Sequence, residues 1–335
     1  MIRPSLGIAG GVALAASLVL AGCGGGTPSA TGPTTTTATA PTTAPGATWS
    51  NAISVAKGAS LTVVSCASPS LCVAGSASGQ SYRISDGKPA TIGPVGSTPS
   101  PQGTNYLTCT TATFCAAVPN QNQAVLFNGT AWGAPTTISS AQGFESIGCV
   151  GTTFCVSIDG EGNSFVYNGA RWSGNVGAWG AANQISCASP AFCVAVEGGP
   201  SVWNGHSWTQ PSDADPQGQL NSVACPSPAF CMAVDSAGDV LTWTGSAFSV
   251  PASIAKEPPL SGTNASGLTS VSCPTTTFCR AVDSIGRVFN YNGSSWSSGT
   301  LIDNGHDLTS VSCPTVSYCM AVDQSGRAFV SASAS

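Results

Sequence analysis

Fourteen of the 15 cysteines in this 335-residue chain form seven pairs, and in every pair five residues separate the two members. The first members are Cys66, Cys109, Cys149, Cys187, Cys225, Cys273 and Cys313, and the second members are Cys72, Cys115, Cys155, Cys193, Cys231, Cys279 and Cys319. Regularly spaced cysteines in even number are typical of disulfide-bonded proteins from oxidising compartments. Cysteines can also bind metal ions, so the spacing must be compared with both disulfide formation and metal binding.

Disulfides fit this spacing better than zinc does. Cysteines six positions apart, on either side of a tight antiparallel turn, can face each other with Cα atoms roughly 4.5–5.5 Å apart, within disulfide range. Zinc sites usually place about two to four residues between cysteines and need four ligands, and only His206 and His306 could supplement the cysteines. We therefore predict seven disulfides, each within its own repeat, and neither a metal site nor another cofactor.

Carboxylates also recur, each directly after an apolar run: Asp159, Glu197, Asp235, Asp283 and Asp323. A ring of acids could bind a central cation. However, strands lie about 4.8 Å apart, so these turns would be on the order of 10 Å from a central axis and from one another. A cation needs several oxygens at about 2.3–2.6 Å. We expect the aspartates to accept hydrogen bonds from their own turns instead.

The recurrent tryptophans could stack on sugars, but packing explains their spacing better. Trp132, Trp172, Trp208 and Trp296 each follow a turn at a fixed distance, which is typical of contacts between repeats. Neither histidine has an adjacent serine or cysteine in a nucleophile motif. The sequence therefore contains no catalytic constellation, and we predict no catalytic residue.

The composition excludes some classes of partner. Charged residues are 7% of the chain, against about 25% in ordinary globular proteins. The net charge is -5 and the few cations are scattered, which argues against a nucleic-acid partner, because that binding needs clustered cations. Hydrophobic residues are 42%, enough to form a core.

The first 22 residues have the pattern of a signal peptide. Arg3 precedes a largely apolar run from Leu6 to Leu20, and that run is short for a mature membrane span. We predict that residues 1–22 are an export signal.

The signal ends in Leu20-Ala21-Gly22-Cys23, which resembles the lipobox of bacterial lipoproteins. The resemblance implies that Cys23 is lipidated and becomes the first mature residue. Residues 24–46 are uncharged and rich in Gly, Thr, Pro, Ala and Ser, a composition that does not bury enough surface to order itself. We therefore predict a lipidated, disordered tether over residues 23–46 and a folded domain over residues 47–335.

The cysteine pairs mark the repeats of that domain. From Cys66 to Cys313 the six steps average about 41 residues, and a period of roughly 40–45 residues with four strands indicates propeller blades. In the sixth copy we expect four strands, A, B, C and D, over 269–273, 278–283, 287–292 and 295–302 in that order. Asn292-Gly293 predicts the last hairpin turn, because both residues tolerate positive φ. The fold class is therefore all-β, a seven-bladed propeller with four antiparallel strands per blade.

The two ends of the domain predict how the ring closes. The seventh copy stops after its third strand, near Val330, whereas residues 46–55 before the first copy match a fourth strand. Trp49 occupies the position in this segment that Trp296 occupies in the fourth strand of the sixth copy. We expect the N-terminal strand to complete the last blade, because closure leaves only short edges.

From Trp49 to Val330 the repeats resemble those of secreted β-propeller lipoproteins of high-GC Gram-positive, actinobacterial type. The shared pattern is Ser-Val-Ser-Cys-Pro, then Phe-Cys-x-Ala-Val-Asp, then Gly. The Tyr-Asn-Gly-Ser-Ser-Trp segment is also similar to kelch and sialidase repeats, but the sialidase Asp-box spacing and arginine cluster are absent. The resemblance implies a fold rather than an activity, because propellers host many functions.

We therefore expect a monomeric binding or scaffold module for a protein or glycan, anchored to the outer face of the cell membrane through Cys23. The alternative is an extracellular hydrolase or lyase acting on glycan or wall material, with a site at the central mouth of the propeller. It would require carboxylates with perturbed pKa values in a pocket there. Binding is expected on the face that carries the B–C turns and the connections between blades, because the other face has short or disulfide-bonded turns.

Overall fold

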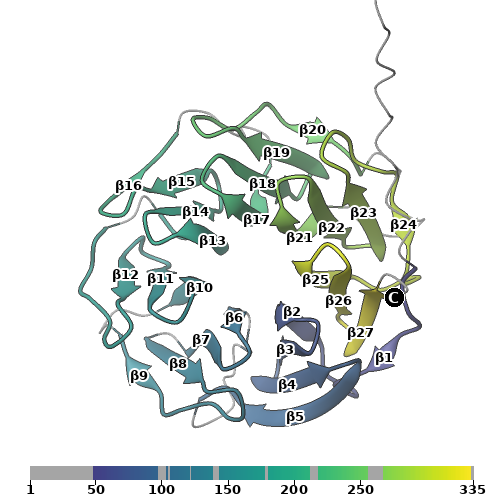
Figure 1. Ribbon diagram of the computed structural model, residues 1–335, viewed down its shortest axis with the longest axis horizontal. Helices are drawn as coiled ribbons and strands as arrows, with labels where there is room; N and C mark the ends of the chain where they lie inside the picture. The colour runs from purple at the N-terminus through teal and green to yellow at the C-terminus, as the bar shows by residue number, and fades with distance from the viewer. Residues whose placement is uncertain are drawn as a thin grey trace, which may run out of the picture. The chain divides into compact units, whose positions relative to one another are not determined.

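Seven antiparallel sheets surround a central axis and form a β-propeller (Figure 1). The computed structural model describes residues 48–96, 103–104, 106–120, 122–138, 143–177, 180–211, 218–255 and 267–332. The all-β, seven-bladed prediction is confirmed. In this part of the chain no helix is long and apolar enough to cross a membrane. The predicted signal peptide, Cys23 and the tether lie outside the described residues, so those expectations remain predictions.

Each blade begins with an inner strand at the axis, and the later strands follow outward (Figure 1). Blades 1 and 2 contain β2 (Leu61–Ser68), β3 (Leu71–Ser76), β4 (Gln80–Ser85), β5 (Lys88–Pro94), β6 (Leu107–Thr111), β7 (Phe114–Asn120), β8 (Gln123–Phe127) and β9 (Thr136–Thr137). Blades 3 and 4 contain β10 (Phe144–Val150), β11 (Phe154–Asp159), β12 (Ser164–Tyr167), β13 (Gln184–Ser189), β14 (Phe192–Val196), β15 (Pro200–Trp203) and β16 (Trp208–Thr209).

The last three blades repeat the plan. They contain β17 (Leu220–Ser227), β18 (Phe230–Asp235), β19 (Asp239–Trp243), β20 (Ala252–Ser253), β21 (Leu268–Thr275), β22 (Phe278–Asp283), β23 (Arg287–Tyr291), β24 (Thr300–Leu301), β25 (Leu308–Thr315), β26 (Tyr318–Asp323), β27 (Arg327–Ala332) and β1 (Ile53–Ser54). In blade 3 the sheet has three regular strands, and the fourth position holds a segment in which Trp172 bridges Tyr167. The outer strand of blade 6, β24, covers Thr300–Leu301, whereas the sequence predicts a strand over 295–302.

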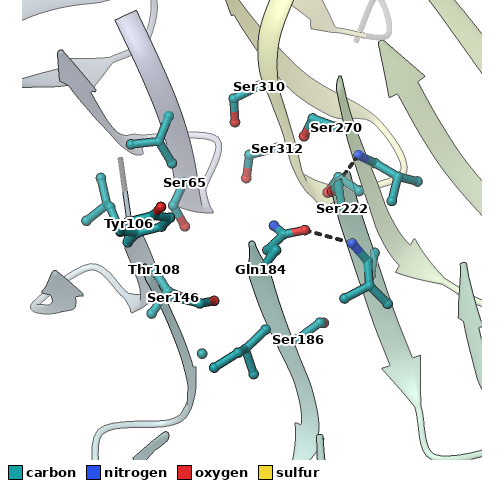
Figure 2. A pocket seen from close by; sticks show the side chains of 18 of the residues that line it. Ser65, Tyr106, Thr108, Ser146, Gln184, Ser186, Ser222, Ser270, Ser310 and Ser312 are labelled. Atoms are coloured by element: carbon teal, nitrogen blue, oxygen red, sulfur yellow. Dashed lines mark hydrogen bonds between the residues drawn. The ribbon is translucent and has the colours of Figure 1, made fainter. Parts of the chain in front are cut away.

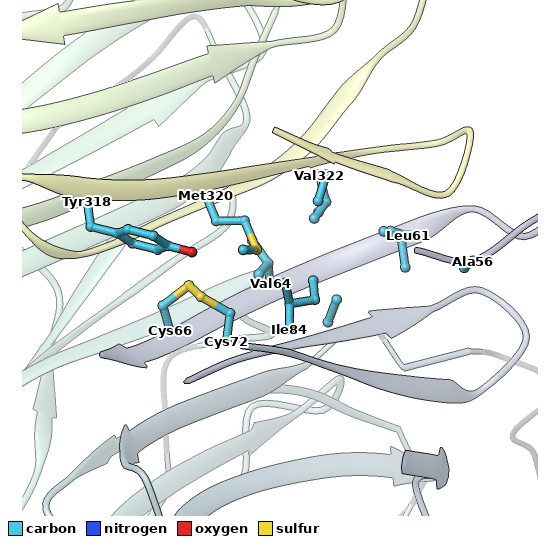
Figure 3. Packing of buried hydrophobic residues seen from close by; sticks show 11 residues of the cluster. Ala56, Leu61, Val64, Cys66, Cys72, Ile84, Tyr318, Met320 and Val322 are labelled. Atoms are coloured by element: carbon cyan, nitrogen blue, oxygen red, sulfur yellow. A yellow bond between two sulfur atoms is a disulfide. The ribbon is translucent and has the colours of Figure 1, made fainter. Parts of the chain in front are cut away.

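The second strand of each blade is apolar on both sides because neighbouring blades cover both of its faces. Every residue of β3, β11 and β26 is buried. Figure 3 shows the contact between blades 7 and 1, where Tyr318, Met320 and Val322 face Val64 and the Cys66–Cys72 disulfide. The stacking of blades therefore supplies the hydrophobic core.

All seven cysteine pairs form disulfides within their own blades, with Cα atoms 3.9–4.1 Å apart. These Cα distances are shorter than the separation expected from a regular pair of strands. A register shift follows the first cysteine in several blades, for example between Cys66 and Ser68. Each bridge links the inner strand to the second strand at the turn that joins them.

The Asn-Gly turns form for a different reason from the predicted one. Gly293 has a φ of +94°, but Asn292 does not adopt a positive φ. Instead, the Asn292 side-chain oxygen accepts hydrogen bonds from the amides of Ser294 and Ser295, at 3.0 and 2.9 Å. Among the described residues other than glycine, only Asp86 has a positive φ.

The N-terminal strand closes the ring, as predicted. Ile53 and Ser54 of β1 pair with Ala328 and Arg327 of β27. Trp49 bridges Ser331 in the same sheet. The guanidinium of Arg280, from blade 6, lies 5.3 Å from the centre of the Trp49 ring. Trp49 therefore joins the last blade to its neighbour.

Candidate functional site

The seven inner strands enclose a cavity of about 380 Å3 on the axis of the ring (Figure 2). Every inner strand contributes residues to its wall, and none of the described lining residues is Asp, Glu, His, Lys or Arg. The polar lining consists of hydroxyl and amide side chains, including Ser65, Tyr106, Thr108, Ser146, Gln184 and Ser186. The wall can therefore donate and accept hydrogen bonds but contains no acid–base pair.

Many of these hydroxyl and amide groups hold the ring together. The serines of the Ser-Val-Ser-Cys motif accept hydrogen bonds from backbone amides of the next inner strand. Ser310 and Ser312 accept from Val64 and Cys66, at 3.1 and 2.9 Å. We call such a contact, from a side chain to the next inner strand, a cross-blade bond.

The other cross-blade bonds from backbone amides follow the same register. The donor–acceptor pairs are Cys109–Ser65, Val223–Gln184, Cys225–Ser186, Val271–Ser222, Val311–Ser270 and Cys313–Ser272, with distances between 2.7 and 3.1 Å. With the pairs formed by Val64 and Cys66, eight of the 14 equivalent amides are bonded in this way.

These bonds are unevenly distributed around the ring. In blades 5, 6, 7 and 1, seven of the eight equivalent amides are bonded, the exception being Cys273. In the described part of blades 2, 3 and 4, only the Cys109 amide has such a bond, at 2.8 Å. We call blades 5, 6, 7 and 1 the bonded sector and blades 2, 3 and 4 the unbonded sector.

The amides without a cross-blade bond in the unbonded sector are those of Leu107, Ile147, Cys149, Ile185 and Cys187. The residues that would accept from them are Val63, Tyr106, Thr108, Ser146 and Gly148. Valine and glycine have no acceptor in the side chain, and the three hydroxyl side chains make no such contact within the described structure.

A second set of cross-blade bonds runs from side chains to carbonyl oxygens of the next blade. Thr309 donates to Leu61 O at 2.9 Å, and Asn183 donates to Leu220 O at 3.1 Å. Thr62, Asn221 and Thr269 make equivalent bonds. The equivalent residue in blade 3 is Glu145, and an ionised carboxylate has no proton to donate. Among the described residues, the contact between blades 3 and 4 therefore lacks both sets of cross-blade bonds.

Glu145 and Glu197 are two carboxylates of the unbonded sector that influence the pKa values of their neighbours. Burial first, and then the charges of Glu145 and Glu197, raise the pKa of the Tyr106 phenol. Burial, followed by Glu197 and Asp159, also raises the pKa of Glu145. Neither glutamate forms an ion pair with a described residue. Both lie at the B–C end of the channel, because Glu145 is near the start of an inner strand and Glu197 follows the end of β14.

The aspartates of the B–C turns have a structural role, as predicted. Asp159, Asp235, Asp283 and Asp323 each accept two hydrogen bonds from backbone amides of their own turns. Glu197 forms no such pair of bonds. In the described part of the chain, no cluster of three or more His, Cys, Asp or Glu residues could hold a metal ion.

Two of these aspartates also pair with arginines, which the sequence reasoning missed. Arg287 Nε lies 2.7 Å from Asp283 Oδ2. Arg327 bridges Asp323 and Asp303, at 2.6 and 2.7 Å. Burial first, and then the hydrogen bond to Asp323, raise the pKa of Asp303 to about 6, while Arg327 opposes that rise. In both pairs the arginine lies four positions after the aspartate, and this spacing in the sequence could have predicted the ion pairs.

The recurrent tryptophans are packing residues, as predicted. Trp208 is 5% exposed, and its Nε1 donates to Ser164 Oγ of blade 3 at 3.0 Å. Trp132 donates to Ser81 of blade 1 at 2.8 Å. Their indole rings therefore help to join neighbouring blades, and their edges are not free for a sugar.

Comparison with known proteins supports the fold. No protein-family model matches the sequence, and no curated protein matches it. Among solved structures, "Structure of U3-55K" has a TM-score of 0.71 and 13% identity over 84% of this chain and 98% of that one. "Crystal structure of RRP9 WD40 repeats" has a TM-score of 0.70 and 12% identity over 84% and 96%.

A third similar structure contains a bound peptide. "YCF48 bound to D1 peptide" has a TM-score of 0.67 and 13% identity, and the match covers 85% of this chain and 97% of that one. At these identities the likeness shows a common propeller architecture.

Proposed function

We propose that this protein is a binding module that is anchored to the outer face of the cell membrane and recognises a protein partner through one end of its central channel. The observation that carries the proposal is the channel itself: a cavity of about 380 Å3 with a polar, uncharged wall, on a disulfide-bonded ring. Rigid scaffolds with a concave polar site suit recognition, because little order is lost on binding.

The peptide complex of YCF48 supports the choice of a protein partner over a glycan, because it shows a similar propeller bound to a peptide. The tryptophans point the same way, since the inter-blade hydrogen bonds of Trp132 and Trp208 occupy their indole groups.

The location rests on sequence features and on the disulfides. The run Leu20-Ala21-Gly22-Cys23 has the form of a lipidation site, and seven disulfides suit an oxidising compartment outside the cytoplasm. Cys23→Ser should move the protein from the membrane fraction to the soluble fraction or leave the precursor uncleaved. Normal processing with full membrane retention would overturn the anchor.

The partner can be sought with the full chain in detergent, immobilised and exposed to solubilised surface proteins and, in parallel, to a glycan array. The proposal expects saturable retention of a specific protein, and competition by the free full chain should abolish that retention. Retention of glycans alone would replace the protein partner with a sugar ligand. If nothing is retained in either arm, a binding role is wrong.

A glycan-directed hydrolase or lyase is the second candidate, and one observation favours it. The pKa of Glu145 is raised beside Glu197, as a general acid requires. Neither glutamate, however, lines the cavity. Turnover of wall-derived oligosaccharides by the wild type, lost in Glu145→Gln, would favour the enzyme over the binding module.

A further inference from the structure

The inner edge of β10 differs from the equivalent edges in the bonded sector. In blade 7 the amides of Val311 and Cys313 are occupied by Ser270 and Ser272, at 3.1 and 2.9 Å. Their equivalents in β10, Ile147 and Cys149, have no acceptor in the described part of the protein. Both residues line the central cavity. This edge can therefore donate two backbone hydrogen bonds to a ligand in the channel.

Strand edges with free amides bind extended peptides, because peptide carbonyl groups accept the bonds that a neighbouring strand would otherwise accept. In the bonded sector, serine side chains and Gln184 occupy all of these donors except the Cys273 amide. The unbonded sector is therefore the part of the wall that can recognise a peptide backbone.

The charges at the B–C end of the channel determine which peptide fits. Glu145 and Glu197 come from neighbouring blades, and both act electrostatically on Tyr106, which lines the cavity. Neither has a cationic partner among the described residues, whereas Asp283, Asp303 and Asp323 are paired with arginines. An aromatic ring and two unpaired carboxylates at the same end of a channel favour the binding of a cation there.

We propose that an extended peptide segment carrying a lysine or arginine binds the unbonded sector, with its backbone carbonyl groups on the Ile147 and Cys149 amides and its cation beside Tyr106, Glu145 and Glu197. This inference rests on the proposed function and names the partner's chemistry. A cavity of about 380 Å3 admits a short segment rather than a whole domain, so the basic residue belongs to a loop or a chain end.

The first test uses a displayed library of random linear peptides, selected on the full-length protein in detergent. The selected peptides should share a lysine or arginine. A synthetic copy of one of them should lose affinity about tenfold when that residue becomes glutamine, and about tenfold towards the Glu145→Gln/Glu197→Gln variant. The matched control is Glu161→Gln, since Glu161 is exposed on a B–C turn of the same sector and should leave affinity unchanged.

The second test measures hydrogen exchange of backbone amides with and without the selected peptide. Binding should slow exchange at Ile147 and Cys149 and leave Val311 and Cys313 unchanged. A Tyr106→Ser variant places an acceptor where Ser222 stands in blade 5, so it should reduce the effect of the peptide at Ile147.

The outcomes separate this inference from the proposed function. Selected peptides without a basic residue, or full affinity in the double variant, would overturn the inference and leave a peptide-binding module. Peptide-induced protection confined to the bonded sector would also overturn it. If the library yields no binder while a surface protein is retained in the earlier experiment, the inference fails and the proposed function stands.

Discussion

The contact between blades 7 and 1 and the contact between blades 3 and 4 use equivalent strands, yet among the described residues only the first contact has cross-blade bonds. Between blades 7 and 1, Thr309, Ser310 and Ser312 all reach the next strand. Between blades 3 and 4 the equivalent residues are Glu145, Ser146 and Gly148, and none makes such a bond. Side chains at three positions therefore determine how tightly the inner strands are joined, and a sector without these bonds can offer its backbone to a ligand.

The largest expected effect concerns closure, which belongs to the bonded sector. Deleting residues 24–57 removes β1 and Trp49 and exposes the edge of β27, so aggregation or a loss of several kcal/mol in unfolding free energy is expected. Deleting residues 24–46 alone should leave the melting temperature unchanged. Equal melting temperatures for the two truncations would show that β1 does not close the ring.

Removing cross-blade bonds should cost more in the bonded sector. Ser310→Ala/Ser312→Ala removes two bonds and should lower the unfolding free energy by about 1–3 kcal/mol, measured by denaturant titration. Ser146→Ala is the matched control, because the Ser146 hydroxyl makes no cross-blade bond to a described residue, and it should cost less than the double variant. Equal losses would mean that the serines contribute nothing specific to the contact between blades.

Adding a serine should have opposite effects in the two sectors. Ala224→Ser places a hydroxyl where Ser272 stands in blade 6 and should stabilise the protein by about 0.5–1 kcal/mol through a bond to the Cys273 amide. Gly148→Ser should destabilise it, because a Cβ there would lie 2.9 Å from Ile185 Cγ2. The melting temperatures of both variants, compared with the wild type, test this prediction. A higher melting temperature in both variants would contradict the close contact between position 148 and Ile185.

The smallest effect is a pH dependence in the bonded sector. The pKa of Asp303 is about 6 in the folded protein, above its ordinary value. Between the two pKa values, the folded state keeps a proton on Asp303 that the unfolded state has already released. The unfolding free energy should therefore fall as the pH rises from about 4 to 7.

Asp303→Asn should remove that part of the pH dependence. Denaturant titrations at several pH values give the comparison. If the wild type and Asp303→Asn have the same dependence on pH, the pKa of Asp303 is not raised in the folded protein.

The sequence was sufficient to predict the ring because its signals are local and repeated. Cysteine spacing, the apolar second strand and the matching Trp49 and Trp296 segments all depend on short stretches of chain. The turn at Asn292 was assigned to the right place for the wrong reason, since the sequence does not reveal whether a side-chain hydrogen bond or a positive φ makes the turn.

The residues of the candidate site were not predicted, because they depend on contacts between blades. Ser310 and Val64 are 246 positions apart, and their hydrogen bond becomes visible only when the ring is closed. The sequence did contain a signal: at the two positions where the motifs of blades 6 and 7 have serine, blade 2 has Tyr106 and blade 3 has Gly148. Without the structure, those departures could not be distinguished from ordinary variation between repeats.

The most direct test of the two-sector account is amide hydrogen exchange in the free protein, compared between equivalent positions. Ile147 and Cys149 should exchange roughly 3–10 times faster than Val311 and Cys313, because only the latter two amides have cross-blade bonds, each worth about 0.5–1.5 kcal/mol. The adjoining disulfides are the same in both blades, so they cancel in the comparison. Equal exchange rates at these four amides would contradict the distinction between bonded and unbonded sectors.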